Sequence, residues 1–138
     1  MIIADTNVVS EFMKDEADPA VLAWAESLES TDLTICVVSV EEIERGLGRL
    51  PTGKRRRDLE QRWHVLVDAF SDAIAVYDVA AARATAKILV DAEAGGHPMA
   101  LADAQIAGIC VAGAYRLATR NQRDFEHVTA LSIVNPFV

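Results

Sequence analysis

The sequence predicts a single α/β domain with three layers, in which helices cover both faces of a mainly parallel sheet of four to five strands. Short apolar runs alternate with helix-like segments along the chain, which is the order of βαβ units. The apolar runs carry few polar residues, as is typical of strands buried on both faces. The chain has 138 residues, 51% of them hydrophobic, so residues 1–138 suit one domain with its own core.

The first half of the chain begins with the apolar run MIIA, which predicts a strand over residues 1–4. A helix is expected to follow Asn7. A second helix begins at Asp18-Pro19, since Asp is a favourable N-cap and Pro fits the first helical position. The run LTICVV, residues 33–38, predicts a second strand.

The segment SVEEIERGLGRL, residues 39–50, predicts a helix directly after that strand. Ser39 and Glu42 have the spacing of a capping box at its start. The connection PTGKRRRD contains the only basic cluster and leads into a further helix. The elements expected after it are a strand at 74–79, a helix at 80–95 ending at Gly95-Gly96, a helix at 98–115 started by Pro98, a strand at 116–119, a turn or short helix at 121–125 and a strand at 131–134.

The net charge of −8 indicates a protein that repels bulk nucleic acid, so any action on nucleic acid needs a local offset such as bound divalent cations. No run of 18 apolar residues is present, and Asp5 interrupts the N-terminus too early for a signal peptide. We therefore expect no membrane span and a cytoplasmic location. Cys36 and Cys110 lie in apolar runs and are expected to be buried free thiols.

The first candidate site residue is Asp5, which follows the first expected strand. Ligands of parallel sheets bind beyond the carboxyl ends of the strands, although an Asp before a helix is also an ordinary cap. Asp103 lies on an apolar helical stripe, at positions i, i+3, i+4 and i+7 with Ile106, Ala107 and Cys110. An inward carboxylate needs a partner, and its own helix offers no Lys or Arg. A metal ion is one solution, and a hydrogen bond from a backbone N–H is another.

Glu42 has two interpretations. It either completes the capping box with Ser39 or joins Asp5 and Asp103 at the same edge of the sheet. Gly46 lies one turn further on and leaves open space beside Glu42, a feature that the neighbouring Glu41 lacks. Three carboxylates at one edge suit a hard cation such as Mg²⁺ or Mn²⁺, and such an ion suits phosphodiester cleavage by an activated water.

Five segments, taken together, resemble a PIN domain, and most closely the VapC-type toxins and the branch that includes the FitB proteins. They are MIIADTNVVSE, SVEEIERGL, ALADAQIAG, LATRNQRDFEHV and SIVNPFV, and their order spans nearly the whole chain. The resemblance implies a magnesium-dependent endoribonuclease that is inhibited by a co-expressed antitoxin. It also implies a homodimer that joins the antitoxin in a larger assembly.

Carried over by position, the resemblance makes Asp5, Glu42 and Asp103 the catalytic and metal-binding carboxylates. Many relatives have Asp in a T-x-D turn where this chain has Asn121, and Asp124 could take over as a further metal ligand. The polar residues expected around the centre are Thr6, Asn7, Ser39, Thr119 and Asn121.

Two other functions share part of this pattern. One is a catalytically inactive PIN-like subunit that binds RNA or metal for regulation. The other is a haloacid dehalogenase-type phosphatase, which needs a second Asp at the position of Asn7 and is therefore disfavoured. The basic cluster consists of Lys54, Arg55, Arg56 and Arg57, which either guide an RNA backbone or form a solvated helix start. His64, His97 and His127 are interpreted as structural.

Overall fold

The computed structural model describes residues 1–138 and contains one parallel sheet of four strands, in the order β2-β1-β3-β4. The central strand β1 pairs with β2 and β3, and β3 pairs with β4, in each case in parallel. The mainly parallel sheet expected from the sequence is therefore confirmed. The strands are β1 (Ile2–Ala4), β2 (Leu33–Thr34), β3 (Arg116–Ala118) and β4 (Ile133–Val134).

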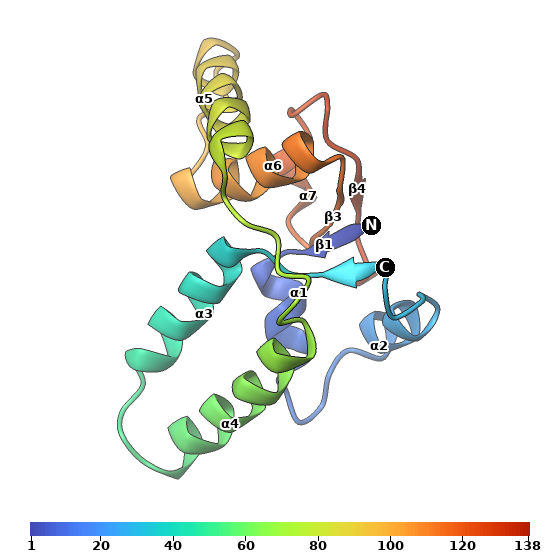
Figure 1. The fold of residues 1–138 in the computed structure, drawn as a ribbon, viewed down its shortest axis with the longest axis vertical. Coiled ribbons are helices and arrows are strands. Elements are labelled where there is room, and N and C mark those ends of the chain that lie inside the picture. Colours follow the sequence, from blue (N-terminus) through green and yellow to red (C-terminus); the bar gives the residue numbers. More distant parts are fainter.

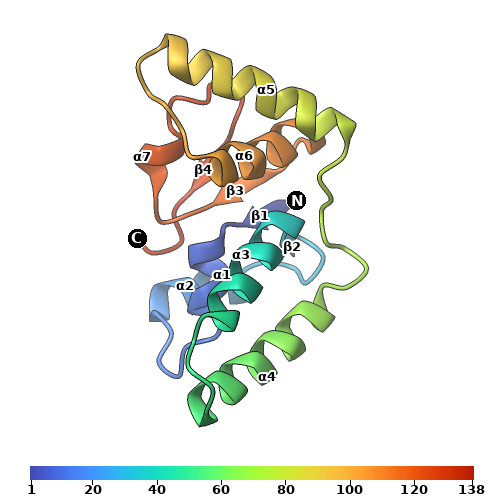
Figure 2. The ribbon, with the colours of Figure 1, turned by 90° about the vertical axis from the view of Figure 1, so that its left-hand side faces the viewer.

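Seven helices cover the two faces of this sheet (Figure 1). In the turned view of Figure 2, α5, α6 and α7 again lie on one side of the strands and α1 to α4 on the other. The helices are α1 (Thr6–Glu11), α2 (Pro19–Glu26), α3 (Val37–Gly48), α4 (Lys54–Ala69), α5 (Val79–Ala94), α6 (Leu101–Gly113) and α7 (Gln122–Phe125).

Two hydrophobic clusters hold the three layers together. Successive strand residues point to opposite faces, so Ile3 packs into the cluster under α5 and α6, while Ile2 and Ala4 pack into the cluster under α1 to α4. Cys36 and Cys110 are buried free thiols in the first of these clusters, as expected. No helix combines the length and the apolar character needed to cross a membrane.

The prediction of a strand at 74–79 is wrong. Only an isolated parallel bridge joins Ala75 to Cys36, and the chain then leaves the sheet with Val76 62% exposed. Asp78 instead caps α5, where its side chain accepts a hydrogen bond from the Ala81 N–H. The chain therefore passes from this single bridge into the capped start of α5.

Two helix starts also differ from expectation. The α3 helix begins at Val37, so Ser39 lies inside the helix, and the expected capping box is wrong. The α6 helix begins at Leu101 and not at Pro98, because Ala100 takes the extended N-cap conformation. The expected start of α2 is confirmed, since the Asp18 side chain accepts a hydrogen bond from the Ala20 N–H and Pro19 occupies the first helical position.

Candidate acidic active site

Four carboxylates from different elements influence one another at the edge of the sheet where β1 and β3 end. Burial is the main cause that raises the pKa of Asp103 to about 6, and the charges of the three other acidic residues add to it. The four residues, called here the acidic centre, are Asp5 after β1, Glu42 in α3, Asp103 in the first turn of α6 and Asp124 in α7.

Asp5 is the most deeply buried member of the acidic centre, with 5% of its surface exposed. Its Oδ1 accepts a hydrogen bond of 2.8 Å from the Thr6 N–H, and its Oδ2 accepts one of 2.8 Å from the Thr119 hydroxyl. Burial raises the pKa of Asp5, and the bonds from Thr119 and Thr6 oppose that rise by stabilising the ionised form. Asp5 is thus both the cap of α1 and a fixed carboxylate of the centre.

Thr119 and Asn7 fasten the chain after β3 to the start of α1. The Thr119 hydroxyl accepts hydrogen bonds from the Asn121 N–H at 3.0 Å and from Asn7 Nδ2 at 3.3 Å. The Oδ1 atom of Asn7 accepts the Arg120 N–H at 3.2 Å. Asn121 takes part through its backbone only, since its side chain makes no hydrogen bond.

Glu42 is oriented by Thr6 and not by the N–H of Ser39. The Thr6 hydroxyl donates to Glu42 Oε1 at 2.8 Å, and Ser39 Oγ lies 2.9 Å from the same hydroxyl oxygen. A Cβ placed on Gly46 would meet no atom within 4 Å, which confirms the open space beside Glu42. Glu41 is exposed and lies 3.7 Å from Arg45, so it faces away from the centre.

Asp103 and Asp124 have carboxylate oxygens with no protein partner. Neither side chain accepts a hydrogen bond or forms an ion pair, and the Arg120 guanidinium stacks on the Phe137 ring at 3.8 Å instead. Oxygen ligands that repel one another fit a hard divalent cation. No three His, Cys, Asp or Glu side chains are grouped tightly enough to enclose an ion, so binding one requires these carboxylates to close together.

A groove of about 670 Å³, called here the α4 groove, begins at Glu42 of the acidic centre and runs between α1, α3 and α4. Thr6 and Glu42 line one part of it, and Lys54 and Arg55 line another. Arg62 also lines this α4 groove and donates a hydrogen bond of 2.9 Å to the Met13 carbonyl. Sequence reasoning missed Arg62, although it lies eight residues, or about two helical turns, after Lys54 and therefore on the same side of α4.

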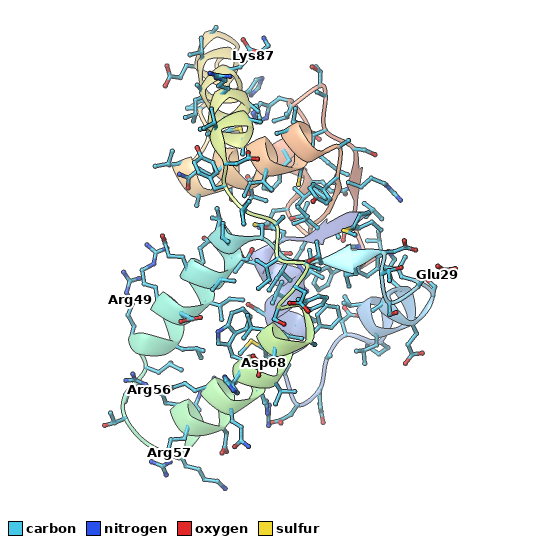
Figure 3. All side chains as sticks on the ribbon, viewed as in Figure 1. Glu29, Arg49, Arg56, Arg57, Asp68 and Lys87 are labelled. Atoms are coloured by element: carbon cyan, nitrogen blue, oxygen red, sulfur yellow. The ribbon has the colours of Figure 1, made fainter.

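The other two residues of the basic cluster do not line the α4 groove. Arg56 pairs with Glu60 at 2.7 Å and donates to the Leu50 carbonyl at 3.2 Å. Figure 3 shows Arg57 at the lower tip of the molecule, where α4 begins. Only half of the predicted basic cluster therefore faces the path to the carboxylates.

The chain is similar to known proteins along nearly its whole length. The family model described as PIN domain matches residues 2–131. VapC ribonuclease Y4jK of Sinorhizobium fredii is 36% identical over 138 residues, covering 99% of this chain and 98% of its own. Toxin FitB of Neisseria gonorrhoeae is 30% identical over 138 residues and covers 99% of both chains.

Solved structures extend the likeness to three dimensions. The crystal structure of FitAcB from Neisseria gonorrhoeae superposes with a TM-score of 0.90 at 30% identity, covering 99% of both chains. A structure of FitAB bound to an IR36 DNA fragment also gives a TM-score of 0.90, covering 100% of this chain and 96% of the other. The fold, the ordered motifs and the family match agree, and this chain belongs to the PIN domain family.

Proposed function

We propose that this chain is the toxin of a type II toxin–antitoxin pair and that it cleaves RNA as a metal-dependent endoribonuclease. Relatives named VapC ribonuclease and toxin FitB match it along its whole length. The observation that carries the proposal is Asp103, whose carboxylate has no hydrogen-bond donor and whose pKa is raised to about 6 by burial and by three like charges. Such a group is stabilised by a cation.

Asp5, Glu42 and Asp103 are the proposed catalytic residues and metal ligands, with Asp124 as a further ligand. The ion is Mg²⁺, and Mn²⁺ is expected to replace it, because both prefer oxygen ligands. When bound, the ion supplies Lewis acidity toward a phosphoryl oxygen and lowers the pKa of a water. One strong site and one weaker site are expected, since Asn121 stands where an acidic residue is usual in relatives.

The hydrogen bonds of this chain prepare the ligands for that role. The Thr119 hydroxyl and the Thr6 N–H fix both oxygens of Asp5, and both hydrogen bonds oppose the rise in the pKa of Asp5 that burial causes. The Thr6 hydroxyl donates to Glu42 Oε1, which leaves Oε2 free. Ser39 and Asn7 support these two threonines. Asp5 and Glu42 are thereby held in place before an ion or RNA arrives, and the closure around the ion is left to Asp103 and Asp124, whose carboxylates have no partner.

The RNA backbone is proposed to enter through the α4 groove. Lys54 and Arg55 line it and have no ion pair in the protein, so they are available to phosphate groups. Arg56 is occupied by Glu60, and Arg57 lies outside the groove. The guiding role is therefore assigned to Lys54 and Arg55, while Arg57 offers a control of equal charge on the same helix.

The proposed partners are a cognate antitoxin that blocks the acidic centre, and a second copy of this chain in a homodimer. One related structure is described as FitAB bound to a DNA fragment, so a larger toxin–antitoxin assembly is proposed here too. An Arg side chain of the antitoxin is suited to bidentate pairing with the carboxylates. Residues 1–138 are proposed to act as a single domain in the cytoplasm.

The proposal is tested by RNA cleavage with the purified chain and a matched pair of variants. Cleavage is expected with Mg²⁺ or Mn²⁺ and is expected to stop when a chelator is added. Glu42→Gln should lower the rate by about 100-fold or more, whereas the exposed neighbour variant Glu41→Gln should keep the parental rate. Equal rates in the two variants, or RNA binding without any cleavage, would contradict the nuclease assignment.

A further inference from the structure

A second cavity, of about 550 Å³, lies between α5, the end of α6 and the segment 127–130. One face of α5 forms its long wall, and none of its lining residues belongs to the acidic centre or the α4 groove. Figure 3 shows Lys87 of this wall at the opposite end of the molecule from Arg57. The volume lies in the range of pockets that hold small molecules.

Two histidines, His97 and His127, meet at this cavity. The sequence alone indicates only structural roles for them. The rings of His97 and His127 stack with centroids 5.6 Å apart and planes inclined by 26°. The Nε2 atom of His127 is the only buried side-chain nitrogen or oxygen in the molecule without a hydrogen-bond partner. Buried polar atoms are nearly always paired in folded proteins, and this nitrogen is closed to a water-sized molecule in the structure, so a ligand bonds it once the imidazole turns toward the cavity.

The charges around the cavity select an anion. Arg83, Lys87 and Asp91 line the cavity together with the two imidazoles, so its charged lining residues leave one positive charge in excess, which disfavours a metal cation there. Lys87 pairs with Asp91 at 3.0 Å, while Arg83 has no ion pair and no hydrogen bond within the protein. The unpaired guanidinium is therefore the natural partner of an anionic group.

The rest of the lining selects an apolar and flat body for that anion. The apolar part of the wall comes from both sides of the cavity, and the stacked imidazoles offer an aromatic face to a ring. The apolar lining residues are Ala84, Ile88, Ala92, Val111, Val128 and Ala130.

We propose that this cavity is a binding site for a small planar organic anion, such as an aromatic carboxylate. The anionic group pairs with Arg83, and the ligand ring packs against the imidazoles and the apolar wall. The His127 imidazole turns toward the cavity as the ligand enters, and its Nε2 then bonds an oxygen of the ligand. The site is separate from the acidic centre, so ligand binding and RNA cleavage can be measured independently.

The test is calorimetric titration of the full chain with 2-naphthoate, with its neutral analogue 2-naphthalenemethanol, with inorganic phosphate and with Zn²⁺. Saturable binding of 2-naphthoate at one site is expected. The neutral 2-naphthalenemethanol, which lacks the charge, and inorganic phosphate, which lacks the ring, should each bind at least about tenfold more weakly. If phosphate binds as tightly as 2-naphthoate, the proposal that the ligand carries a planar ring is wrong. Tight Zn²⁺ binding that His127→Phe abolishes would overturn the anion.

Matched variants locate the site. Arg83→Gln and His127→Phe should each lower the affinity for 2-naphthoate by about tenfold. The remote variants Arg49→Gln and His64→Phe should leave the affinity unchanged. Because His127→Phe alters packing, nitrogen-15 spectra of the parental imidazoles provide a second reading, in which only His97 and His127 should shift on adding 2-naphthoate. No binding at millimolar 2-naphthoate, or equal binding by Arg83→Gln and the parent, would overturn the proposal.

Discussion

Asp103→Asn should make the metal-free protein more stable at neutral pH while it abolishes RNA cleavage. Burial and three like charges raise the pKa of Asp103 from 3.8 to about 6 in the folded state. As the pH rises, the unfolded chain therefore releases this proton before the folded chain does. The carboxyl destabilises the fold as the pH passes from about 4 to about 6, and that loss persists above this range.

The size of the effect follows from the difference between the two pKa values. A change from 3.8 to about 6 corresponds to at most about 3 kcal/mol. Asp103 is only half-buried, and solvent screening reduces this to about 1–2 kcal/mol. An Asn side chain has nearly the same shape and no charge, so it removes the repulsion with little change in packing.

The assay is urea unfolding in a chelator at pH 7.5 and at pH 3.8, followed by circular dichroism. At pH 7.5 the free energy of unfolding of Asp103→Asn should exceed that of the parent by about 1–2 kcal/mol, and at pH 3.8 most of this difference should disappear. The exposed variant Asp72→Asn serves as a control and should change by under about 0.5 kcal/mol at both pH values. If Asp103→Asn is less stable than the parent at pH 7.5, the account of the acidic centre is wrong.

Three further predictions concern the support of Asp5, the α4 groove and the packing of α6 on α5. Thr119→Val removes the hydroxyl that bonds Asp5 and Asn121, so urea unfolding should show a loss of about 1–3 kcal/mol, and Thr119→Ser should restore most of it. Lys54→Gln and Arg55→Gln should each weaken RNA binding and reduce its salt dependence in filter-binding assays, with Arg57→Gln close to the parent. Gly108→Ala places a Cβ 2.0 Å from Thr85 Oγ1 and 2.8 Å from the Ala81 carbonyl, so thermal unfolding should reveal a loss of about 1–3 kcal/mol, and the smaller partner in Thr85→Ala should relieve part of it.

The sequence predicted the sheet and its acidic edge because both depend on local patterns. The apolar runs before Asp5 and Thr119 are strands, and parallel strands end at a common edge. The run at 74–79 is also mainly apolar, yet apolar composition does not distinguish a buried strand from a connection such as this one, in which Val76 is exposed. The missing information is tertiary, since no local signal says that the sheet ends after four strands.

The role of Glu42 shows a second limit of sequence reasoning. The capping-box spacing with Ser39 was real, but α3 starts two residues earlier than expected, and helix ends are the least certain part of any sequence-based prediction. The hydrogen bond from the Thr6 hydroxyl joins residues 36 positions apart, and no spacing rule predicts it. The unpartnered nitrogen of His127 depends in the same way on contacts between distant segments.

The acidic centre is proposed to hold a divalent cation. The most direct measurement is anomalous X-ray diffraction from crystals of the chain soaked in Mn²⁺. We expect a strong manganese peak among Asp5, Glu42, Asp103 and Asp124, and a loss of that peak in Asp103→Asn. Well-diffracting crystals without manganese at these carboxylates, or with the same peak in Asp103→Asn, would contradict it.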